Sequence, residues 1–348
     1  MPQPPRPRVT LAAVAAATGL SVATVSRALA GRGDLASDTR ARVLAAARRL
    51  GYTRSGEARG RPRAGTARLF DLVLGHFHDP YSDEVTAGAR GAAAAAGFDL
   101  VLTAERDRPD DDWPARIRAR GSAGVVLGLV VPTAGQLAQL EAAAIPVVLL
   151  DPRSVHTPPL PVVHTTDRDG GVSAAAHLID AGADRFLVVT GTPAYRFGRA
   201  RIEGFVAEVR RRLPDADVRR VDVDWTGRTA RRRSAPFMAS VRPGERLGVF
   251  ACADTLAEGV YAAAADAGLG IPHDVLVVGF DDVRTARVLT PALTSVHQPI
   301  REMAAAAIGL LTRAAAGETL EPTATVLPTR LVVRASTVRG FGPAAPSA

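Results

Sequence analysis

Residues 9–52 read VTLAAVAAATGLSVATVSRALAGRGDLASDTRARVLAAARRLGY, and their spacing decides the organisation of the first part of the chain. Ser and Thr hydroxyls accept the free backbone N–H groups at the start of a helix, so Thr10 and Ser21 are the expected N-caps of two short helices. Gly19 lies between them, where the turn needs backbone angles that glycine adopts easily. Ala15 is small enough for the second helix to cross the first. The segment is therefore predicted to form a helix-turn-helix unit.

A third helix is expected to complete this unit, from Asp38 to Leu50. Ser37 is its expected cap, and Gly51 is its expected stop. Apolar residues recur at helical spacing in all three segments, so the three helices are predicted to share one small core. The predicted core residues are Leu11, Val14, Leu20, Val25, Ala28, Val43, Leu44, Ala47 and Leu50.

Positive charge is concentrated in the same part of the chain. Residues 1–65 contain 12 Arg and 3 Asp or Glu, a net charge of +9, whereas all 348 residues together carry +8. The rest of the chain therefore carries 8 minus 9, or −1. Such a basic segment neutralises phosphates, and together with the helix-turn-helix spacing it indicates a DNA partner. The alternative is a basic face that is merely solvated.

Residues 9–27 resemble the headpiece of the lactose/galactose repressor family of bacterial transcription regulators, which carries V-T-L-x-x-V-A-x-x-x-G-V-S-x-x-T-V-S-R. Nearly all of that run is present, and the similarity extends from about Val9 to Arg339. The resemblance implies an α/β protein with an N-terminal three-helix helix-turn-helix DNA-binding domain. It also implies a periplasmic-binding-protein-like core of two doubly wound α/β subdomains.

By this resemblance, the second helix enters the major groove of DNA and its first exposed residues, Val22 and Ala23, meet the bases. Both are small and apolar, so they can contact a thymine methyl group but cannot form bidentate hydrogen bonds. Arg27 is the main specificity candidate, because a guanidinium can bond a guanine edge or a phosphate. The other candidate DNA contacts are hydroxyl residues, which suit phosphate oxygens: Thr10, Ser21, Thr24, Ser26 and Thr39. For Thr24 and Ser26, plain helix surface is an equally good interpretation.

Residues 53–66, TRSGEARGRPRAGT, form the predicted linker, which family members fold into a hinge helix on DNA. Here Arg61 replaces the leucine that relatives insert into the minor groove. An arginine can still enter a narrow groove electrostatically. Gly60 and Pro62 disfavour a helix interior, so the bound hinge helix is expected to be shorter, or the segment to stay extended.

Beyond Thr66, apolar runs alternate with Ala-rich helical stretches, which predicts parallel sheets covered by helices on both faces. A span of about 270 residues is long for one such unit and predicts two subdomains with a cleft between them. By resemblance, the chain crosses between the subdomains near Val163, Leu293 and Thr323. Residues 1–65, 66–339 and 340–348 are the expected DNA-binding headpiece with hinge, core and disordered tail. The expected strands are residues 69–74, 98–103, 124–129, 146–150, 185–190, 218–223, 247–252 and 275–279.

Ligands of such folds bind where loops follow the carboxyl ends of the strands. The run HFHDPYS at residues 76–82 stands where relatives carry D-x-x-N-P-F-F. The resemblance also assigns a stacking aromatic ring, an arginine in RARIEGF and two carboxylates to effector binding. The expected effector-binding residues are His76, Phe77, Asp79, Tyr81, Arg201, Trp225, Asp254 and Asp281. Helix capping and ion pairing within the protein are the alternative roles for the charged ones.

Several functions are disfavoured by missing patterns. His76 and His78 lack an evident third ligand, so no metal site is predicted, and no cofactor is expected. The chain has no G-x-G-x-x-G after a strand, no P-loop and no G-x-S-x-G, which disfavours an enzyme. A single cysteine, Cys252, and the absence of a signal sequence or an 18-residue apolar run favour the cytoplasm over a membrane or secretion.

The sequence therefore predicts a cytoplasmic transcriptional repressor that binds a palindromic DNA operator as a homodimer. A small-molecule effector, expected to be a carbohydrate, would bind in the core and control it; whether it acts as inducer or corepressor stays open. The alternative is a sugar sensor that has lost operator specificity, which the apolar Val22 and Ala23 and the altered linker suggest.

Overall fold

A computed structural model of the protein describes residues 10–30, 37–50, 68–105, 112–154, 158–191 and 195–338. Contacts within the chain divide it into two compact units, Met1–Gly65 and Thr66–Ala348. The predicted linker at residues 53–66, with Arg61, and the predicted tail at residues 340–348 lie outside the described residues.

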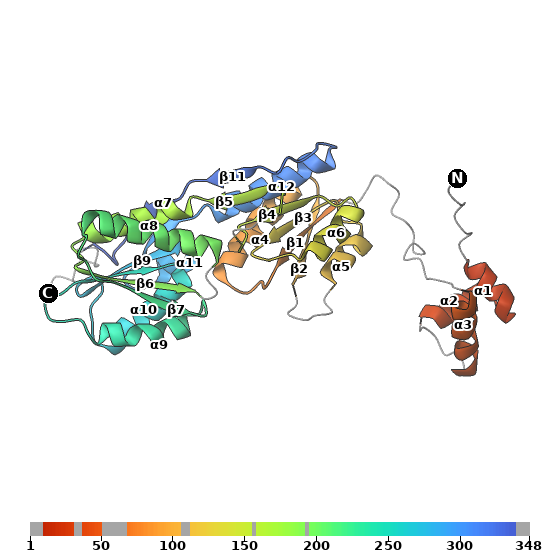
Figure 1. Ribbon diagram of the computed structural model, residues 1–348, viewed down its shortest axis with the longest axis horizontal. Coiled ribbons are helices and arrows are strands. Elements are labelled where there is room, and N and C mark those ends of the chain that lie inside the picture. The colour runs from red at the N-terminus through yellow and green to blue at the C-terminus, as the bar shows by residue number, and fades with distance from the viewer. Residues whose placement is uncertain are drawn as a thin grey trace, which may run out of the picture. The chain divides into compact units, whose positions relative to one another are not determined.

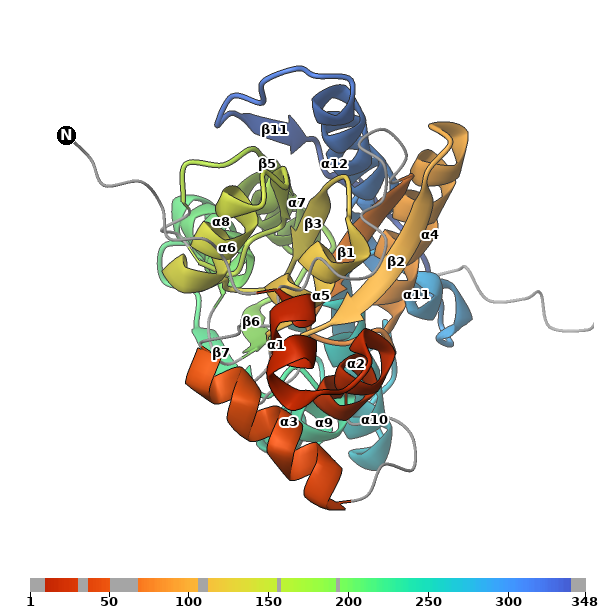
Figure 2. The same ribbon diagram turned by 90° about the vertical axis from the view of Figure 1, so that its right-hand side faces the viewer.

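The first unit contains three helices, drawn in red in Figure 2: α1 (Leu11–Thr18), α2 (Val22–Ala30) and α3 (Ser37–Leu50). The side chain of Thr10 accepts a hydrogen bond from the backbone N–H of Ala13, and Gly19 ends α1 with a φ of 67°. This confirms the predicted helix-turn-helix fold. The core residues shared by the helices are Val14, Ala15, Val25, Ala28, Val43, Ala46 and Ala47.

The second unit contains two six-stranded sheets, each covered by helices on both faces (Figure 1). We call the part around the first sheet the N-terminal subdomain; its strand order is β11-β5-β4-β3-β1-β2, and all its strand pairs are parallel. One face packs on α4 (Pro80–Ala95) and α12 (Ile300–Ala315), and the other on α5 (Trp113–Arg120) and α6 (Ala134–Ala142). The strands are β1 (Leu69–Leu74), β2 (Asp99–Ala104), β3 (Val125–Gly128), β4 (Val147–Leu150), β5 (Val162–Thr165) and β11 (Ala324–Leu327).

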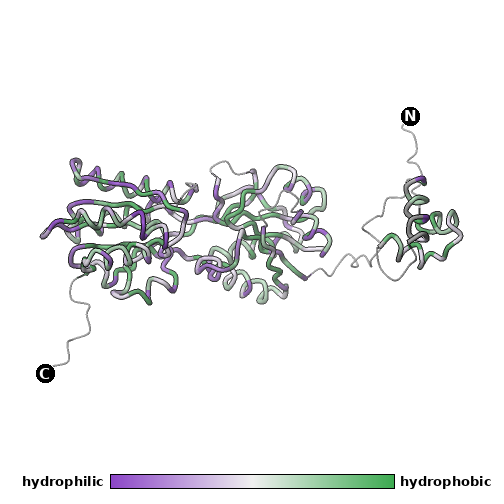
Figure 3. Tube along the Cα trace, turned by 90° about the horizontal axis from the view of Figure 1, so that it is seen from below, coloured by the Kyte–Doolittle hydropathy of each residue, from purple (hydrophilic) through white to green (hydrophobic). Residues whose placement is uncertain are grey.

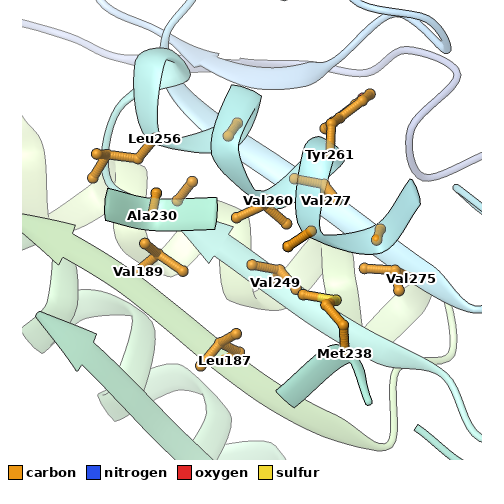
Figure 4. Close-up of a cluster of buried hydrophobic side chains, with 14 of the residues drawn as sticks. Leu187, Val189, Ala230, Met238, Val249, Leu256, Val260, Tyr261, Val275 and Val277 are labelled. Atoms are coloured by element: carbon orange, nitrogen blue, oxygen red, sulfur yellow. The ribbon is translucent and has the colours of Figure 1, made fainter. Parts of the chain in front are cut away.

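The C-terminal subdomain repeats this plan with the strand order β12-β10-β9-β8-β6-β7, and only the β10–β12 pair is antiparallel among its described strands. One face packs on α7 (Asp167–Asp180) and α8 (Arg196–Arg212). The other face packs on α9 (Gly227–Met238), α10 (Asp254–Asp266) and α11 (Arg284–Val288), and Figure 4 shows this core. The strands are β6 (Arg185–Gly191), β7 (Val218–Val223), β8 (Leu247–Ala251), β9 (Val275–Asp281), β10 (Thr294–His297) and β12 (Arg330–Val332).

The fold class predicted from the sequence is thus confirmed. Hydrophobic stretches, drawn in green, run through both subdomains (Figure 3). The chain leaves one subdomain for the other after Thr165, after His297 and after Leu327. These positions lie a few residues beyond the predicted ones, because β5, β10 and β11 extend each sheet before the chain crosses. Neither subdomain is therefore a continuous piece of the chain.

The helices α7 and α8 approach each other unusually closely, through glycines. A Cβ atom at Gly171 would lie 2.0 Å from the carbonyl oxygen of Arg201, and one at Gly204 would lie 2.0 Å from that of Arg168. Only glycine leaves room for such backbone contact. This contact between the two backbones sets the position of Arg201 on α8 relative to the N-terminal end of α7.

Candidate functional site

The first turn of α2 presents the exposed surface of the helix-turn-helix unit. Val22 is 49% exposed although it is apolar, and Ser21 and Ala23 are exposed beside it. The Ser21 hydroxyl accepts from the backbone N–H of Thr24 at 3.1 Å and so caps the helix. A capped helix N-terminus with exposed small side chains suits close approach to a DNA backbone and groove.

The other candidate DNA contacts are distributed over the same three helices. Thr10 is exposed at the start of α1, and Thr24, Ser26 and Thr39 are half-buried. Arg27 lies on α2, but its side chain is outside the described residues, as is Arg61. The position of Arg27 one turn after Val22 and Ala23 places it on the helix that the sequence assigns to the groove.

A cavity of about 330 Å³ opens in the second unit, lined by residues from both subdomains. This volume is at the small end of the usual range for ligand pockets, about 300–1,000 Å³. Six residues that the sequence assigned to an effector line it: His76, Asp79, Tyr81, Arg201, Trp225 and Asp281.

Arg201 is 2% exposed and lines this cavity. Its Nε donates to Asp167 at 3.0 Å, and its Nη1 donates to the Cys252 carbonyl at 2.8 Å and to Asp281 at 3.5 Å. Its guanidinium also stacks over the Phe280 ring, 3.6 Å from the centroid. These contacts hold one guanidinium edge rigidly beside a carboxylate, an arrangement that suits recognition of hydroxyl groups.

Asp281 ends β9 with a φ of 101°, a backbone conformation that residues other than glycine rarely adopt. Its Oδ1 accepts from Gln298 at 3.1 Å as well as from Arg201. Burial raises the pKa of the Asp281 carboxyl to about 7, with Arg201 opposing the rise. Strained backbone of this kind persists where the surrounding structure holds it, often at binding sites.

Asp151 links the two subdomains across the cavity. It follows β4 in the N-terminal subdomain, and its Oδ1 accepts from Arg196 of α8 at 2.8 Å. The Tyr81 hydroxyl donates to its other oxygen at 3.3 Å. Burial raises the pKa of the Asp151 carboxyl to about 6, with Asp167 adding to the rise and Arg196 opposing it. An ion pair across the cleft ties the relative position of the subdomains to the contents of the cavity.

Asp79 has a mixed role, because it lines the cavity and also caps α4. Its Oδ1 accepts from the backbone N–H groups of Tyr81 and Ser82, and its Oδ2 lies 2.7 Å from Nδ1 of His76. The capping alternative raised from the sequence is therefore part of its role. His76 and His78 have ring centroids 4.9 Å apart, and the described residues contain no group of three or more potential metal ligands.

Aromatic rings form one wall of the cavity. The ring of Trp225 stacks on that of Tyr195 with centroids 5.7 Å apart, and the Phe197 ring lies 5.6 Å from it. A Cβ at Gly191 would come within 1.7 Å of the Trp225 indole, so the indole lies flat against a residue without a side chain. Flat aromatic surfaces of this kind stack on the apolar faces of sugar rings and on planar bases.

Two sequence-predicted residues do not line the cavity. Asp254 is 0% exposed; its oxygens accept from the Ser295 hydroxyl at 2.6 Å and from the backbone N–H of Val283 at 2.9 Å. Burial raises its pKa well above the ordinary value. Phe77 packs against the core of the N-terminal subdomain. Both residues follow a strand, as predicted, but their side chains turn into the protein.

The sequence analysis missed several cavity residues. All of them lie on segments that follow a strand, which is a usable signal, but none belongs to a motif that singles it out. The missed lining residues are Leu129, Asp151, Arg153, Tyr195, Phe197, Asp224, Ala253 and Thr255. In the described part of the chain, no helix is both long and apolar enough to cross a membrane.

Comparison with known proteins gives matches to both units. Residues 10–55 match the bacterial regulatory proteins of the lacI family, and residues 175–337 match a periplasmic binding protein-like domain. An uncharacterised HTH-type transcriptional regulator in the aml 5′ region of Streptomyces limosus is 33% identical, with 94% of each chain covered. MalR of Streptomyces coelicolor is 31% identical, over 95% of this chain and 97% of its own. The solved complex of the transcriptional regulator CelR with cellobiose has a TM-score of 0.68 at 27% identity, covering 94% of this chain and 100% of its own.

A helix-turn-helix unit joined to a ligand-binding core of this type defines a DNA-binding transcriptional regulator. The chain belongs to the lacI family of bacterial regulatory proteins. The resemblance seen in the sequence is thereby confirmed. The relatives, matched over 94% and 97% of their own length, are transcriptional regulators, and the protein is not an enzyme.

Proposed function

We propose that the protein is a repressor that binds a palindromic operator as a homodimer and responds to a carbohydrate in the core cavity. The observation that carries the effector assignment is the buried Arg201–Asp281 pair facing an aromatic wall. Hydroxyl groups of a sugar suit the polar pair, and its C–H face suits the indole of Trp225. CelR, the relative solved with cellobiose, is consistent with this class of ligand.

The mechanism follows from the position of the cavity between the subdomains. Tyr81 and Asp151 belong to one subdomain, whereas Arg201 and Asp281 belong to the other. A ligand that contacts both sides favours one relative orientation over others, in proportion to its preference for that orientation. That preference is the free energy available to change operator affinity.

A dimer and a palindrome go together because a single recognition helix of nine residues covers only part of one groove. Two copies related by a two-fold axis would read two half-sites of opposite orientation. In this proposal Val22, Ala23 and Arg27 meet base edges, and the neighbouring hydroxyl residues meet phosphates. In this proposal the protein acts in the cytoplasm, together with its DNA partner.

Selection of genomic DNA fragments by the purified full-length protein at moderate salt tests this proposal. We expect an enriched inverted repeat, and we expect Arg27→Ala to lose about 1–3 kcal/mol of specific binding free energy. Arg49→Ala is the matched control, because it removes the same charge from an exposed position on α3 and should keep the motif.

Uniform, salt-sensitive binding without a motif would contradict operator recognition. It would favour the second candidate, a sugar sensor without operator specificity, for which the apolar Val22 and Ala23 are the supporting observation.

A further inference from the structure

Arg153 is a cavity cation that no anion of the described protein neutralises. It stands on the loop after β4, and its guanidinium lies over the Tyr195 ring, 4.7 Å from the centroid. Its Nε is buried and has no hydrogen-bond partner among the described residues. None of the described carboxylates forms an ion pair with this side chain. Its backbone oxygen accepts from the N–H of Arg196 at 2.8 Å, which fixes the loop against the other subdomain.

The carboxylates of the cavity already have partners within the protein. Asp79 caps α4 and pairs with His76, and Asp151 is held by Arg196 and Tyr81. Asp281 is bonded to Arg201 and Gln298, and Asp224 accepts from the Thr226 hydroxyl at 2.6 Å near the solvent. The protein therefore supplies a countercharge or a hydrogen-bond donor to each cavity carboxylate, whereas no described carboxylate pairs with the Arg153 guanidinium.

The other free groups of the cavity outline a ligand with a polar and an apolar side. The Nε1 of Trp225 is buried without a partner among the described residues, and both described bonds to Asp281 go to Oδ1. Oδ2 of Asp281 is thus left to accept a hydroxyl, and the indole is left to stack and donate. Arg153 lines the same cavity from the opposite subdomain.

We propose that the effector is an anionic carbohydrate, and that Arg153 binds its carboxylate or phosphate group. The inference rests on the proposed function, because it assumes that the effector occupies this cavity. The guanidinium would then make a cation–π contact with the Tyr195 ring and an ion pair with the anionic group of the ligand. A contact from Arg153 to the ligand also joins the two subdomains, so charge on the ligand contributes to the regulatory response.

Isothermal calorimetry on the full-length protein at constant ionic strength tests this inference with matched ligands. The probes are D-glucose, D-glucuronate and D-glucose 6-phosphate, D-galactose and D-galacturonate, and D-ribose and D-ribose 5-phosphate. We expect at least one anionic probe to bind about 10- to 100-fold more tightly than its neutral parent, as for a hydrogen bond to a charged group. The acids and the phosphates then distinguish the two sources of the charge.

Variants test whether Arg153 is the cause. Arg153→Gln should reduce the affinity for the anionic probe to that for its neutral parent, and Arg153→Lys should keep part of the preference. Arg233→Gln, which removes an exposed arginine of α9 outside the cavity, should leave the preference unchanged.

The inference is overturned if a neutral sugar binds as tightly as its anion, if no anionic probe binds, or if the preference survives Arg153→Gln. Release of operator DNA by a neutral sugar would distinguish the proposed function from the proposal that Arg153 binds an anionic group. In that case the proposed function holds, and Arg153 only covers the ring of Tyr195.

Discussion

At the residue scale, the orientation of Trp225 depends on its own backbone and on one glycine. Trp225 has a φ of 63°, which is uncommon for a residue with a bulky side chain, and its indole rests against Gly191. The positive φ turns the ring over the end of β6, where the cavity opens. The aromatic wall therefore depends on the absence of a side chain at position 191.

Gly191→Ala should weaken effector binding by several-fold to about tenfold, the loss expected for one displaced aromatic contact. The new methyl group would overlap the indole and push it out of its stack with Tyr195. Calorimetry with the effector measures the change. Gly91→Ala, at a position with open space around it, is the control and should leave the affinity unaltered; equal affinities of both variants would contradict this role of Gly191.

Sequence position identified the edge of the sheet that carries the site, but not the direction of each side chain. Tyr81 follows β1, Asp281 ends β9, and both line the cavity, whereas Asp254 follows β8 and turns inward to Ser295 and Val283. The inward direction of the Asp254 side chain is set by hydrogen-bond donors on distant segments. The local spacing of the sequence does not reveal these donors. Arg153 was missed for the same reason, because only the fold brings its loop to Tyr195.

At the element scale, the packing of α7 against α8 positions the cavity arginine. Gly204→Ala should lower the free energy of unfolding by about 1–3 kcal/mol, because a methyl group has to force two backbones apart. The same displacement should move Arg201 away from Asp167 and weaken effector binding. Chemical denaturation and calorimetry on one preparation measure both effects.

Gly309→Ala is the control for Gly204→Ala, because it should stabilise the protein rather than destabilise it. Gly309 lies within α12 with no atom near the site of a Cβ, so alanine should raise the free energy of unfolding by about 0.5–1 kcal/mol. A stabilised Gly204→Ala protein would show that the α7–α8 contact tolerates a wider spacing.

The same scale explains which strands could be predicted. The strand β8 is continuously apolar, β9 is apolar up to its last residue, and both are buried on both faces, so their sequence alone identifies them. The strands β5, β10, β11 and β12 have only three or four residues, and β11 is largely exposed. These strands form because they pair with strands that are distant in the sequence. A short window of sequence does not show those partners.

At the scale of the whole molecule, the buried carboxyls make stability depend on pH. Burial raises the pKa values of Asp151 to about 6 and of Asp281 to about 7, against 3.8 for an exposed aspartate. At a pH between 3.8 and these raised pKa values, Asp151 and Asp281 hold protons in the folded protein that they have lost in the unfolded chain. The free energy of unfolding of the ligand-free protein should therefore fall as the pH rises from about 5 to 8.

Denaturation at pH 5 and pH 8 measures this slope, and Asp281→Asn should reduce it. His177 contributes in the opposite direction, because burial lowers its pKa and the folded protein then binds fewer protons than the unfolded chain. A free energy of unfolding that rises steadily over this range would show that both carboxyls are ionised at pH 5.

The three crossings between the subdomains have a consequence for the synthesis of the protein. The first sheet to leave the ribosome gains its covering helix α12 and its edge strand β11 only after the C-terminal subdomain has been translated from α7 to β10, all of it but β12. Until then, the apolar face that Met303, Ile308 and Leu311 will cover stays open to water and to other nascent chains. The segment made late thus completes the sheet made first, and this interval is when a chaperone has the most surface to protect.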